Sequence, residues 1–227
     1  MKILLTAATH FEIAALEAHL KKHFIQAEPY RFQKGEIQIA LLITGVGLPM
    51  AAYALGKVIG ADEWDLAINA GIGGSLDQAY PLGTVVQVVS ERFADLGVEE
   101  ADGAFTSVHE LGLIERGQAP FEADGRIVNQ GGSEFGFLPK AHGISVNRVH
   151  GHEPSIQALR QQYPEAQVES MEGAAFFYAC ALERIPYLQV RAISNWVEAR
   201  DRGRWEVELA LDKLNTTLVE LVQSLFA

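Results

Sequence analysis

Apolar runs alternate with amphipathic segments along most of this chain. Short apolar runs are typical of buried strands, and apolar residues spaced three and four apart are typical of helices that cover a sheet. This pattern predicts strands at residues 2–6, 36–44, 66–70, 84–91, 143–149 and 187–193. It predicts helices at residues 12–23, 49–59, 154–163, 171–184 and 205–226.

This alternation favours an α/β fold. We expect three layers, with a central mixed, mostly parallel twisted sheet flanked by helices on both faces. Because α/β folds often reach this length undivided, residues 1–227 are expected to form a single domain. Residues 97–129 are rich in glycine and polar residues without a clear period, and they could form a lid or an oligomer contact. Ligands of open α/β sheets usually bind beyond the carboxyl ends of the strands, so the residues that follow strands are the candidates for function.

Charge and cysteine content narrow the classes of partner. Lys and Arg total 18 against 29 Asp and Glu, a net charge of −11, which would repel a polyanion, so we expect no nucleic-acid partner. No apolar stretch approaches the ~20 residues that span a bilayer, so no membrane partner is expected. The one cysteine, Cys180, lies in an apolar segment and is interpreted as a core thiol in a reducing, cytoplasmic setting.

Glycine-rich turns follow several of the predicted strands. Each fits a tight turn that packs a helix onto the sheet, as well as a close backbone approach to a ligand. The turn at residues 45–47 lacks the third glycine of a dinucleotide-binding motif, since Met50 stands there, and the chain has no phosphate-binding loop. We therefore expect no nicotinamide, flavin or ATP, and no other cofactor.

Two histidine pairs have spacings that could suit a metal. These are His150 with His152, and His19 with His23. Neither pair has a third ligand close in sequence, so all four are interpreted as surface histidines and no metal is expected.

Several of these features together resemble one enzyme superfamily. They are the Gly-rich turn after Asn69, the pair Met171 and Glu172 before an Ala-rich helix, the strand end at residues 191–195, and the early Glu12. This set resembles the purine nucleoside phosphorylase and nucleosidase superfamily. Within it, residues 194–205 most resemble the futalosine hydrolases of the alternative menaquinone pathway. The resemblance implies a nucleoside phosphorylase-like fold and a homo-oligomer, a dimer or higher, in which a neighbouring subunit often completes the pocket.

The resemblance also implies roles for two carboxylates. Glu172 would accept hydrogen bonds from the ribose 2′- and 3′-hydroxyls, with Met171 against the sugar, although a Glu at a helix N-terminus is also favoured electrostatically. Glu12 would be the general base that deprotonates water. Its alternative is a capping box with Thr9, which the T-x-x-E spacing favours slightly when taken alone. Further substrate-binding residues by the same resemblance are Gly71, Ile72, Gly73, Ser194 and Trp196.

Asn195 bears on the choice of base, and its counterpart in the methylthioadenosine and adenosylhomocysteine nucleosidases is normally Asp. An amide donates through its NH₂ group, so it could serve both N7 and the O6 acceptor of hypoxanthine, whereas the 6-amino group of adenine would oppose it. We therefore assign Asn195 a catalytic role with a 6-oxopurine leaving group. The alternative is an Asn that caps the following turn.

The expected reaction is the hydrolysis of futalosine to hypoxanthine and dehypoxanthinyl futalosine. Hydrolysis is preferred to phosphorolysis because the turn after the first strand carries Glu12 but no Arg to hold phosphate. The benzoate of futalosine would need cations or a stacking ring, for which the candidates are Arg200, Arg202, Trp196 and Phe135, unless these charges are only solvated. A methylthioadenosine or adenosylhomocysteine nucleosidase, a purine nucleoside phosphorylase and a catalytically silent nucleoside-binding protein remain alternatives.

Overall fold

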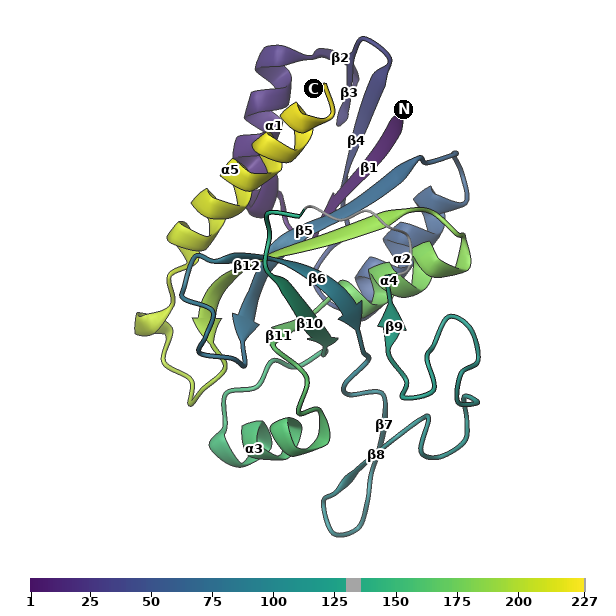
Figure 1. Ribbon diagram of the computed structural model, residues 1–227, viewed down its shortest axis with the longest axis vertical. Coiled ribbons are helices and arrows are strands. Elements are labelled where there is room, and N and C mark those ends of the chain that lie inside the picture. Colours follow the sequence, from purple (N-terminus) through teal and green to yellow (C-terminus); the bar gives the residue numbers. More distant parts are fainter. Residues whose placement is uncertain (130–135, 227) are drawn as a thin grey trace.

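The computed structural model describes residues 1–129 and 136–226 and contains strands and helices in alternation along much of the chain (Figure 1). The helices are α1 (His10–His23), α2 (Leu48–Ile59), α3 (Glu153–Gln162), α4 (Gly173–Leu182), α5 (Val207–Ser224) and the 3₁₀ turn η1 (Arg202–Arg204). The longer strands are β1 (Lys2–Ala7), β4 (Ile37–Ile43), β5 (Leu66–Ser75), β6 (Val85–Glu91), β10 (Lys140–Ser145) and β12 (Tyr187–Trp196). The shorter strands are β2 (Ile25–Glu28), β3 (Arg31–Lys34), β7 (Gly97–Glu99), β8 (Phe105–Ser107), β9 (Ile127–Val128) and β11 (Val168–Ser170).

The main sheet is mixed, as the sequence predicts. Its strand order is β11-β10-β6-β12-β5-β1-β4-β3-β2, with β9 attached to β6. Strand β1 pairs in parallel with β4 and β5, and β12 pairs in parallel with β5 but antiparallel with β6. Strand β11 pairs with both β10 and the far end of β5, so this half of the sheet curls back on itself. The carboxyl ends of β1, β5 and β12 therefore meet at one edge.

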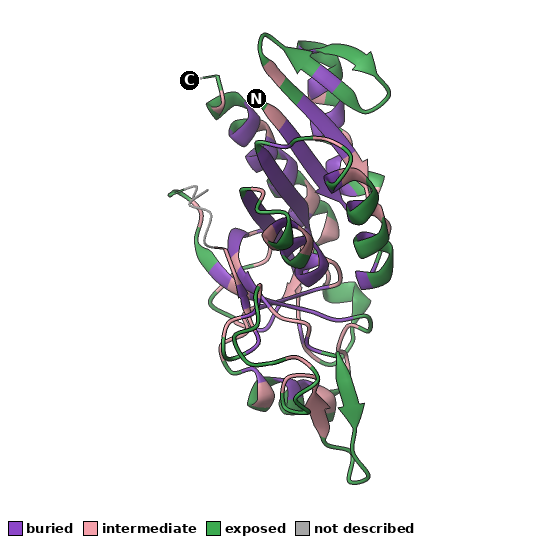
Figure 2. Cartoon of the chain, turned by 90° about the vertical axis from the view of Figure 1, so that its right-hand side faces the viewer, coloured by how far each residue is buried: buried purple, intermediate pink, exposed green. Residues whose placement is uncertain are grey.

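Helices cover both faces of this sheet. Figure 1 shows α1 and α5 together on one side and α2 and α4 on the other. Alternate side chains of β1 point to opposite faces of the sheet. Leu5 packs in the hydrophobic cluster under α1 and α5, and Leu4 packs in the cluster under α2 and α4. Figure 2 shows the central strands buried between these layers. Burial of apolar surface on both faces explains why these strands are apolar throughout.

Strand β5 is longer than predicted, and this changes the setting of the Gly-rich segment. Residues 71–74 lie inside the strand rather than in a turn, because β12 pairs with all four of them and β11 pairs with Gly74 on the other side. A Cβ on Gly73 would lie 3.0 Å from Val168 Cγ1, so glycine permits this close approach of neighbouring strands. In the same way, Asn195 lies within β12 rather than beyond its end.

Six short strands and part of one long strand were not predicted, and three of them, β7, β8 and β9, lie in the segment at residues 97–129. Strands β2 and β3 are mostly exposed and polar, and β11 has only three residues, so none shows a clear apolar pattern. The predicted strand at residues 143–149 is shifted, since β10 ends at Ser145.

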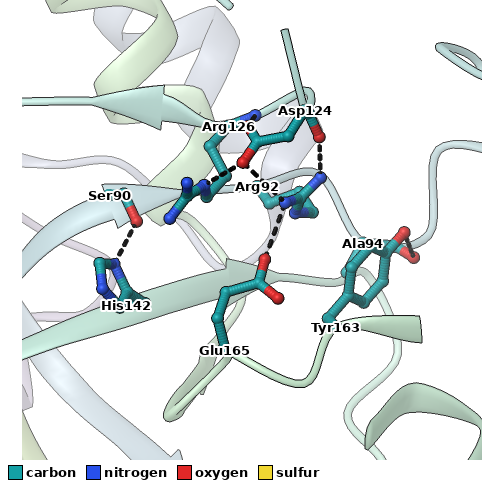
Figure 3. A network of polar contacts seen from close by, with 8 residues as sticks. All are labelled: Ser90, Arg92, Ala94, Asp124, Arg126, His142, Tyr163 and Glu165. Atoms are coloured by element: carbon teal, nitrogen blue, oxygen red, sulfur yellow. Dashed lines mark hydrogen bonds and ion pairs between the residues drawn. The ribbon is translucent and has the colours of Figure 1, made fainter. Parts of the chain in front are cut away.

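The segment at residues 97–129 is held to the body of the protein through Arg92, in the network that Figure 3 shows. The Arg92 guanidinium pairs with Glu165 at 2.7 Å and lies 5.1 Å from the centre of the Tyr163 ring. It also donates to the carbonyl oxygen of Asp124. Arg92 thus ties this largely irregular segment to the loop after α3, in addition to the pairing of β9 with β6.

The structure also bears on the expectations for Cys180 and for membrane-spanning segments. Cys180 is buried in α4 with its thiol free, as expected of a core cysteine. Within the described ranges, none of the helices combines the length and apolar character that crossing a membrane requires.

Candidate functional site

A cavity of about 570 Å³ opens where β1, β5 and β12 end and where α1 and α4 begin. This is the position that an α/β sheet predicts for a ligand. The cavity is lined by Ala8, Thr9, Phe11, Glu12, Val46, Ile72, Gly73, Gly74, Val149, His150, Glu169, Ser170, Met171, Glu172, Ser194, Asn195, Arg200, Trp205, Val207 and Leu211.

Glu12 lies in this cavity and also belongs to a capping box at the start of α1. Its Oε2 accepts hydrogen bonds from the backbone N–H and the hydroxyl of Thr9, at 2.9 and 3.1 Å. Its Oε1 accepts from the backbone N–H of Ile72 at 3.1 Å. The two interpretations of Glu12 are therefore compatible, because capping holds the carboxylate in place and Oε1 keeps a further lone pair for a ligand.

A buried amide supports the first turn of α1 from behind. Asn215 of α5 accepts from the Leu16 N–H at 2.8 Å and donates to the Glu12 carbonyl at 3.0 Å. These two backbone groups would bond to each other in a regular helix, so the side chain of Asn215 is inserted between them. The insertion ties α5 to the backbone of Glu12.

Arg191 is the most important residue of the site that sequence reasoning left without a role. It is 1% exposed, and its Nε has no hydrogen-bond partner among the described residues. A Cβ on Gly71 would lie 2.8 Å from Glu12 Oε1 and 3.4 Å from Arg191 Nη1, so both charged groups converge over this glycine. The sequence did contain an indication of this role, because Arg191 is a single cationic residue inside an apolar strand. Burying a charge is energetically unfavourable unless polar or charged partners lie near it.

Glu172 stands at the N-cap of α4 and is mostly buried. Burial raises the pKa of Glu172, while the charge of Arg191 and a hydrogen bond from Gly47 act in the opposite direction. The Gly47 N–H donates to Glu172 Oε1 at 2.8 Å. Since Gly47 has φ +96°, a conformation that favours glycine, this turn is shaped to hold the carboxylate.

Asn195 lines the cavity with its amide orientation fixed by two neighbours. Its Oδ1 accepts from the Ser194 hydroxyl at 2.9 Å, and its Nδ2 donates to the Trp196 carbonyl at 3.0 Å. One N–H of the amide is therefore engaged, and the other has no partner among the described residues and is available to a ligand. The sequence expectation of two donated bonds to a purine requires the contact with Trp196 to give way.

The structure brings together most of the other predicted site residues. Ile72, Gly73, Met171, Ser194 and Arg200 line the cavity. Gly71, Trp196 and Arg202 lie outside its lining, with Gly71 beneath Glu12 and Arg202 exposed in η1. Trp205 lines the cavity and lies 5.1 Å from the Arg200 guanidinium, measured to its ring centre. Phe135 lies outside the described residues.

His150 is not a surface histidine, and that interpretation was wrong. It lines the cavity and pairs through Nδ1 with Glu169, a carboxylate whose side chain is 3% exposed. His152, two residues later, is exposed. Sequence alone could not separate the two, because the partner carboxylate comes from a strand 19 residues further along the chain.

A further buried carboxylate, Glu91, lies at the end of β6. Glu91 accepts from Gln189 at 2.6 Å and from the Ser145 hydroxyl at 2.9 Å, and Ser145 in turn accepts from the Ala174 N–H. Burial raises the pKa of Glu91 to about 7, against the lowering effect of Arg191. This network connects three strands to the first turn of α4, which begins directly after Glu172.

Metal ligands do not gather in the described ranges of the chain. Nowhere in residues 1–129 or 136–226 do three or more His, Cys, Asp or Glu side chains form a group that could hold an ion. The pairs formed by His10 with Glu17 and by His150 with Glu169 each stand alone.

Comparisons with known proteins agree with this architecture. Residues 2–227 match the family model described as the phosphorylase superfamily. A futalosine hydrolase of Streptomyces coelicolor is 33% identical over 186 residues, which cover 80% of this chain and 77% of the relative. A futalosine hydrolase of Thermus thermophilus is 31% identical over 203 residues, covering 86% and 88% of the two chains.

Solved structures show the same fold at lower identity. The 5′-methylthioadenosine/S-adenosylhomocysteine nucleosidase of Neisseria meningitidis, in complex with methylthio-immucillin-A, superposes with a TM-score of 0.75 at 20% identity, covering 98% and 99% of the two chains. The S-adenosylhomocysteine nucleosidase of Streptococcus pyogenes, in complex with 5-methylthiotubericidin, gives a TM-score of 0.76 at 18% identity, covering 99% and 97%.

Proposed function

The chain belongs to the phosphorylase superfamily, and from this premise we propose that it is an N-glycosyl hydrolase that cleaves futalosine, releasing hypoxanthine and dehypoxanthinyl futalosine in the menaquinone pathway. The observation that carries the proposal is the meeting of Glu12, Glu172 and Asn195 in one cavity. The similarity to futalosine hydrolases over most of the chain supports this choice of substrate.

In the proposed reaction, water attacks the anomeric carbon as the bond to the purine breaks. The sugar then gains positive charge and the purine gains negative charge, so the site must stabilise both. Glu12 accepts the proton of the attacking water through Oε1, and its contacts with Thr9 and Ile72 hold it in position. Arg191 is buried behind the cavity lining with its Nη1 close to Glu12 over Gly71, and its positive charge favours the ionised form of Glu12 that accepts this proton.

Glu172 holds the sugar in this proposal. One carboxylate oxygen accepts from Gly47, which leaves the other oxygen and the remaining lone pairs for the 2′- and 3′-hydroxyls. Its negative charge lies on the same face of the pocket as the sugar that becomes positive. Met171 packs against the ribose.

Asn195 receives the departing purine. The N–H that does not bond to Trp196 donates to the N7 and O6 edge, which stabilises the negative charge that develops there. Because the amide cannot give up a proton, solvent completes the protonation of the base.

The benzoate of futalosine is assigned to Arg200. This side chain lines the cavity, is supported by the Trp205 ring and forms no ion pair with any residue in the described ranges. Arg202 lies outside the lining, so it takes at most a secondary part.

We also propose that the protein acts as a homodimer in the cytoplasm. A second cavity of about 560 Å³ lies between α2 and α4, and its lining includes Leu48, Pro49, Tyr178 and Leu182. Helix α2 also exposes apolar side chains outside this lining, such as Tyr53 at 70%.

The test is base release from futalosine, from its 6-amino analogue aminodeoxyfutalosine and from methylthioadenosine, each with and without phosphate. The proposal predicts hypoxanthine from futalosine at a rate that phosphate leaves unchanged. Release that requires phosphate would indicate a phosphorylase, and adenine from methylthioadenosine would indicate the related nucleosidase. Binding without release at enzyme concentrations near that of substrate would indicate a silent binding protein.

A further inference from the structure

His150 and Glu169 form a paired unit in the wall of the cavity. The His150 backbone N–H donates to Glu169 Oε1 at 3.0 Å, and the imidazole Nδ1 contacts Oε2 of the same carboxylate. The Glu169 side chain is 3% exposed and that of His150 is 19% exposed. The carboxylate is thus buried behind the ring, while the ring retains access to the cavity that it lines.

This unit lies at the same end of the cavity as Asn195. Glu169 of β11 stands opposite Gly74 of β5, and Gly74 stands opposite Asn195 of β12. A Cβ on Gly74 would lie 3.1 Å from Asn195 Nδ2, so the amide of Asn195 lies directly against this glycine. The strands that carry Glu169 and Asn195 thus both pair with β5 at Gly74, and His150, in the loop before α3, lines the same cavity as Asn195.

The pairing with Glu169 determines which nitrogen of the ring can accept a hydrogen bond. A carboxylate only accepts, so the proton of a neutral imidazole lies on Nδ1 and the lone pair lies on Nε2. Across residues 1–129 and 136–226, no hydrogen-bond partner is found for Nε2. The cavity thus contains a fixed acceptor in His150 beside a fixed donor in Asn195.

We propose that His150 is a specificity-determining residue that reads the N1–H of a 6-oxopurine through Nε2. The inference rests on the proposed function and names a second contact for its base. Hypoxanthine presents acceptors at N7 and O6 and a donor at N1, which matches the donor of Asn195 and the acceptor of His150. Adenine has a lone pair at N1 and would oppose the lone pair of Nε2. A buried polar group left unpaired by the wrong base gives strong discrimination.

The test compares His150→Ala, His150→Gln and His152→Ala with the wild type. For each protein, kcat/KM is measured for futalosine and for its 6-amino analogue, and dissociation constants are measured for free hypoxanthine and free adenine. In His150→Ala the preference for the 6-oxo substrate and for hypoxanthine should fall by ~10-fold or more. His150→Gln keeps a hydrogen-bond acceptor, so it should recover part of the preference for the 6-oxo substrate and for hypoxanthine. His152 is exposed, so His152→Ala should show the same preference as the wild type.

The two proposals fail in different ways. If wild type releases no hypoxanthine from futalosine, the proposed function fails, while the binding constants of the free bases still test His150. If wild type is active and both substitutions at position 150 retain its preference for the 6-oxo base, the role of His150 is refuted. Circular dichroism of each variant checks folding, and Gln serves as the second variant if Ala disrupts the loop.

Discussion

At the scale of single residues, Glu12 shows how one carboxylate serves both local structure and the cavity. Oε2 accepts two bonds from Thr9, whereas Oε1 accepts one bond among the described residues, from Ile72, and Glu12 lines the cavity. Glutamine also fits the third position of a capping box, so it can replace the carboxylate without removing the cap. The two roles can therefore be separated by one substitution.

Glu12→Gln should lower kcat by ~10²-fold or more, because the amide cannot accept a proton from water. The midpoint of urea unfolding and the dissociation constant of the substrate should stay close to those of the wild type. Steady-state kinetics and equilibrium unfolding measure these quantities. Glu153→Gln, in the exposed first turn of α3, is the matched control. Near-normal turnover in Glu12→Gln would leave this residue with capping alone.

Asn195→Asp should move the preference from 6-oxo toward 6-amino purine nucleosides by ~10-fold or more. A protonated Asp can donate to N7 and accept from the 6-amino group, which the amide does not do while its Oδ1 is bonded to Ser194. The ratio of kcat/KM for futalosine and its 6-amino analogue measures the change within one preparation. An unchanged ratio would remove this side chain from base discrimination.

Some of these site residues could be predicted from the sequence and others could not. Glu12, Glu172 and Asn195 stand next to predicted element ends, where ligands of this fold class bind. Arg191 and Glu169 stand inside strands, and their roles depend on partners from distant segments. Burial and pairing of that kind follow from strand order, which no local pattern encodes.

At the scale of elements, helices were easier to predict than strands. The sequence pattern located all five helices to within about two residues at their ends, although α4 is apolar on nearly every side rather than amphipathic. The Gly-rich half of β5 was predicted as a turn because glycine usually interrupts strands, but here it admits β11 and β12 at close range. The strands β2 and β3 are mostly exposed and show no alternation of apolar and polar residues, so the sequence pattern did not predict them.

Glu91 joins β6, β10, β12 and α4, and its titration should appear in the stability of the fold. An unfolded Glu loses its proton near 4.5, whereas Glu91 in the fold has its pKa raised to about 7. Folded protein therefore holds the proton more tightly between these values. The contribution of Glu91 to the free energy of unfolding should be full below pH 4.5, fall as the pH rises to 7, and be lost above it.

Glu91→Gln removes this titration and retains a neutral polar side chain. Urea unfolding at pH 5 and pH 8 should show that the variant loses less stability between the two pH values than the wild type. Glu99→Gln, at an exposed position of β7, should lose as much as the wild type. Equal losses in all three proteins would show that Glu91 keeps the same protonation in the folded and unfolded states.

At the scale of the whole molecule, the apolar surface on α2 and α4 is continuous with the active-site side of the sheet. Val46 lines the first cavity and Leu48 lines the second, so a partner on this surface would reach the mouth of the site. Large exposed apolar patches of this kind usually mark contact surfaces.

Leu182→Glu should shift the protein from dimer to monomer, because it places a charge on a surface that a partner would desolvate. Analytical ultracentrifugation across a concentration series measures the shift. Leu113→Glu is the matched control, since Leu113 is 72% exposed and lies outside the lining of this surface. A wild-type protein that sediments as a monomer at all concentrations would contradict the proposed homodimer.

The most direct measurement is a competition in water enriched in ¹⁸O, with phosphate present and equal amounts of futalosine and its 6-amino analogue. The account predicts that hypoxanthine accumulates ahead of adenine and that the released sugar carries one ¹⁸O atom at its anomeric carbon. Adenine released as readily as hypoxanthine, or an unlabelled sugar phosphate, would contradict it.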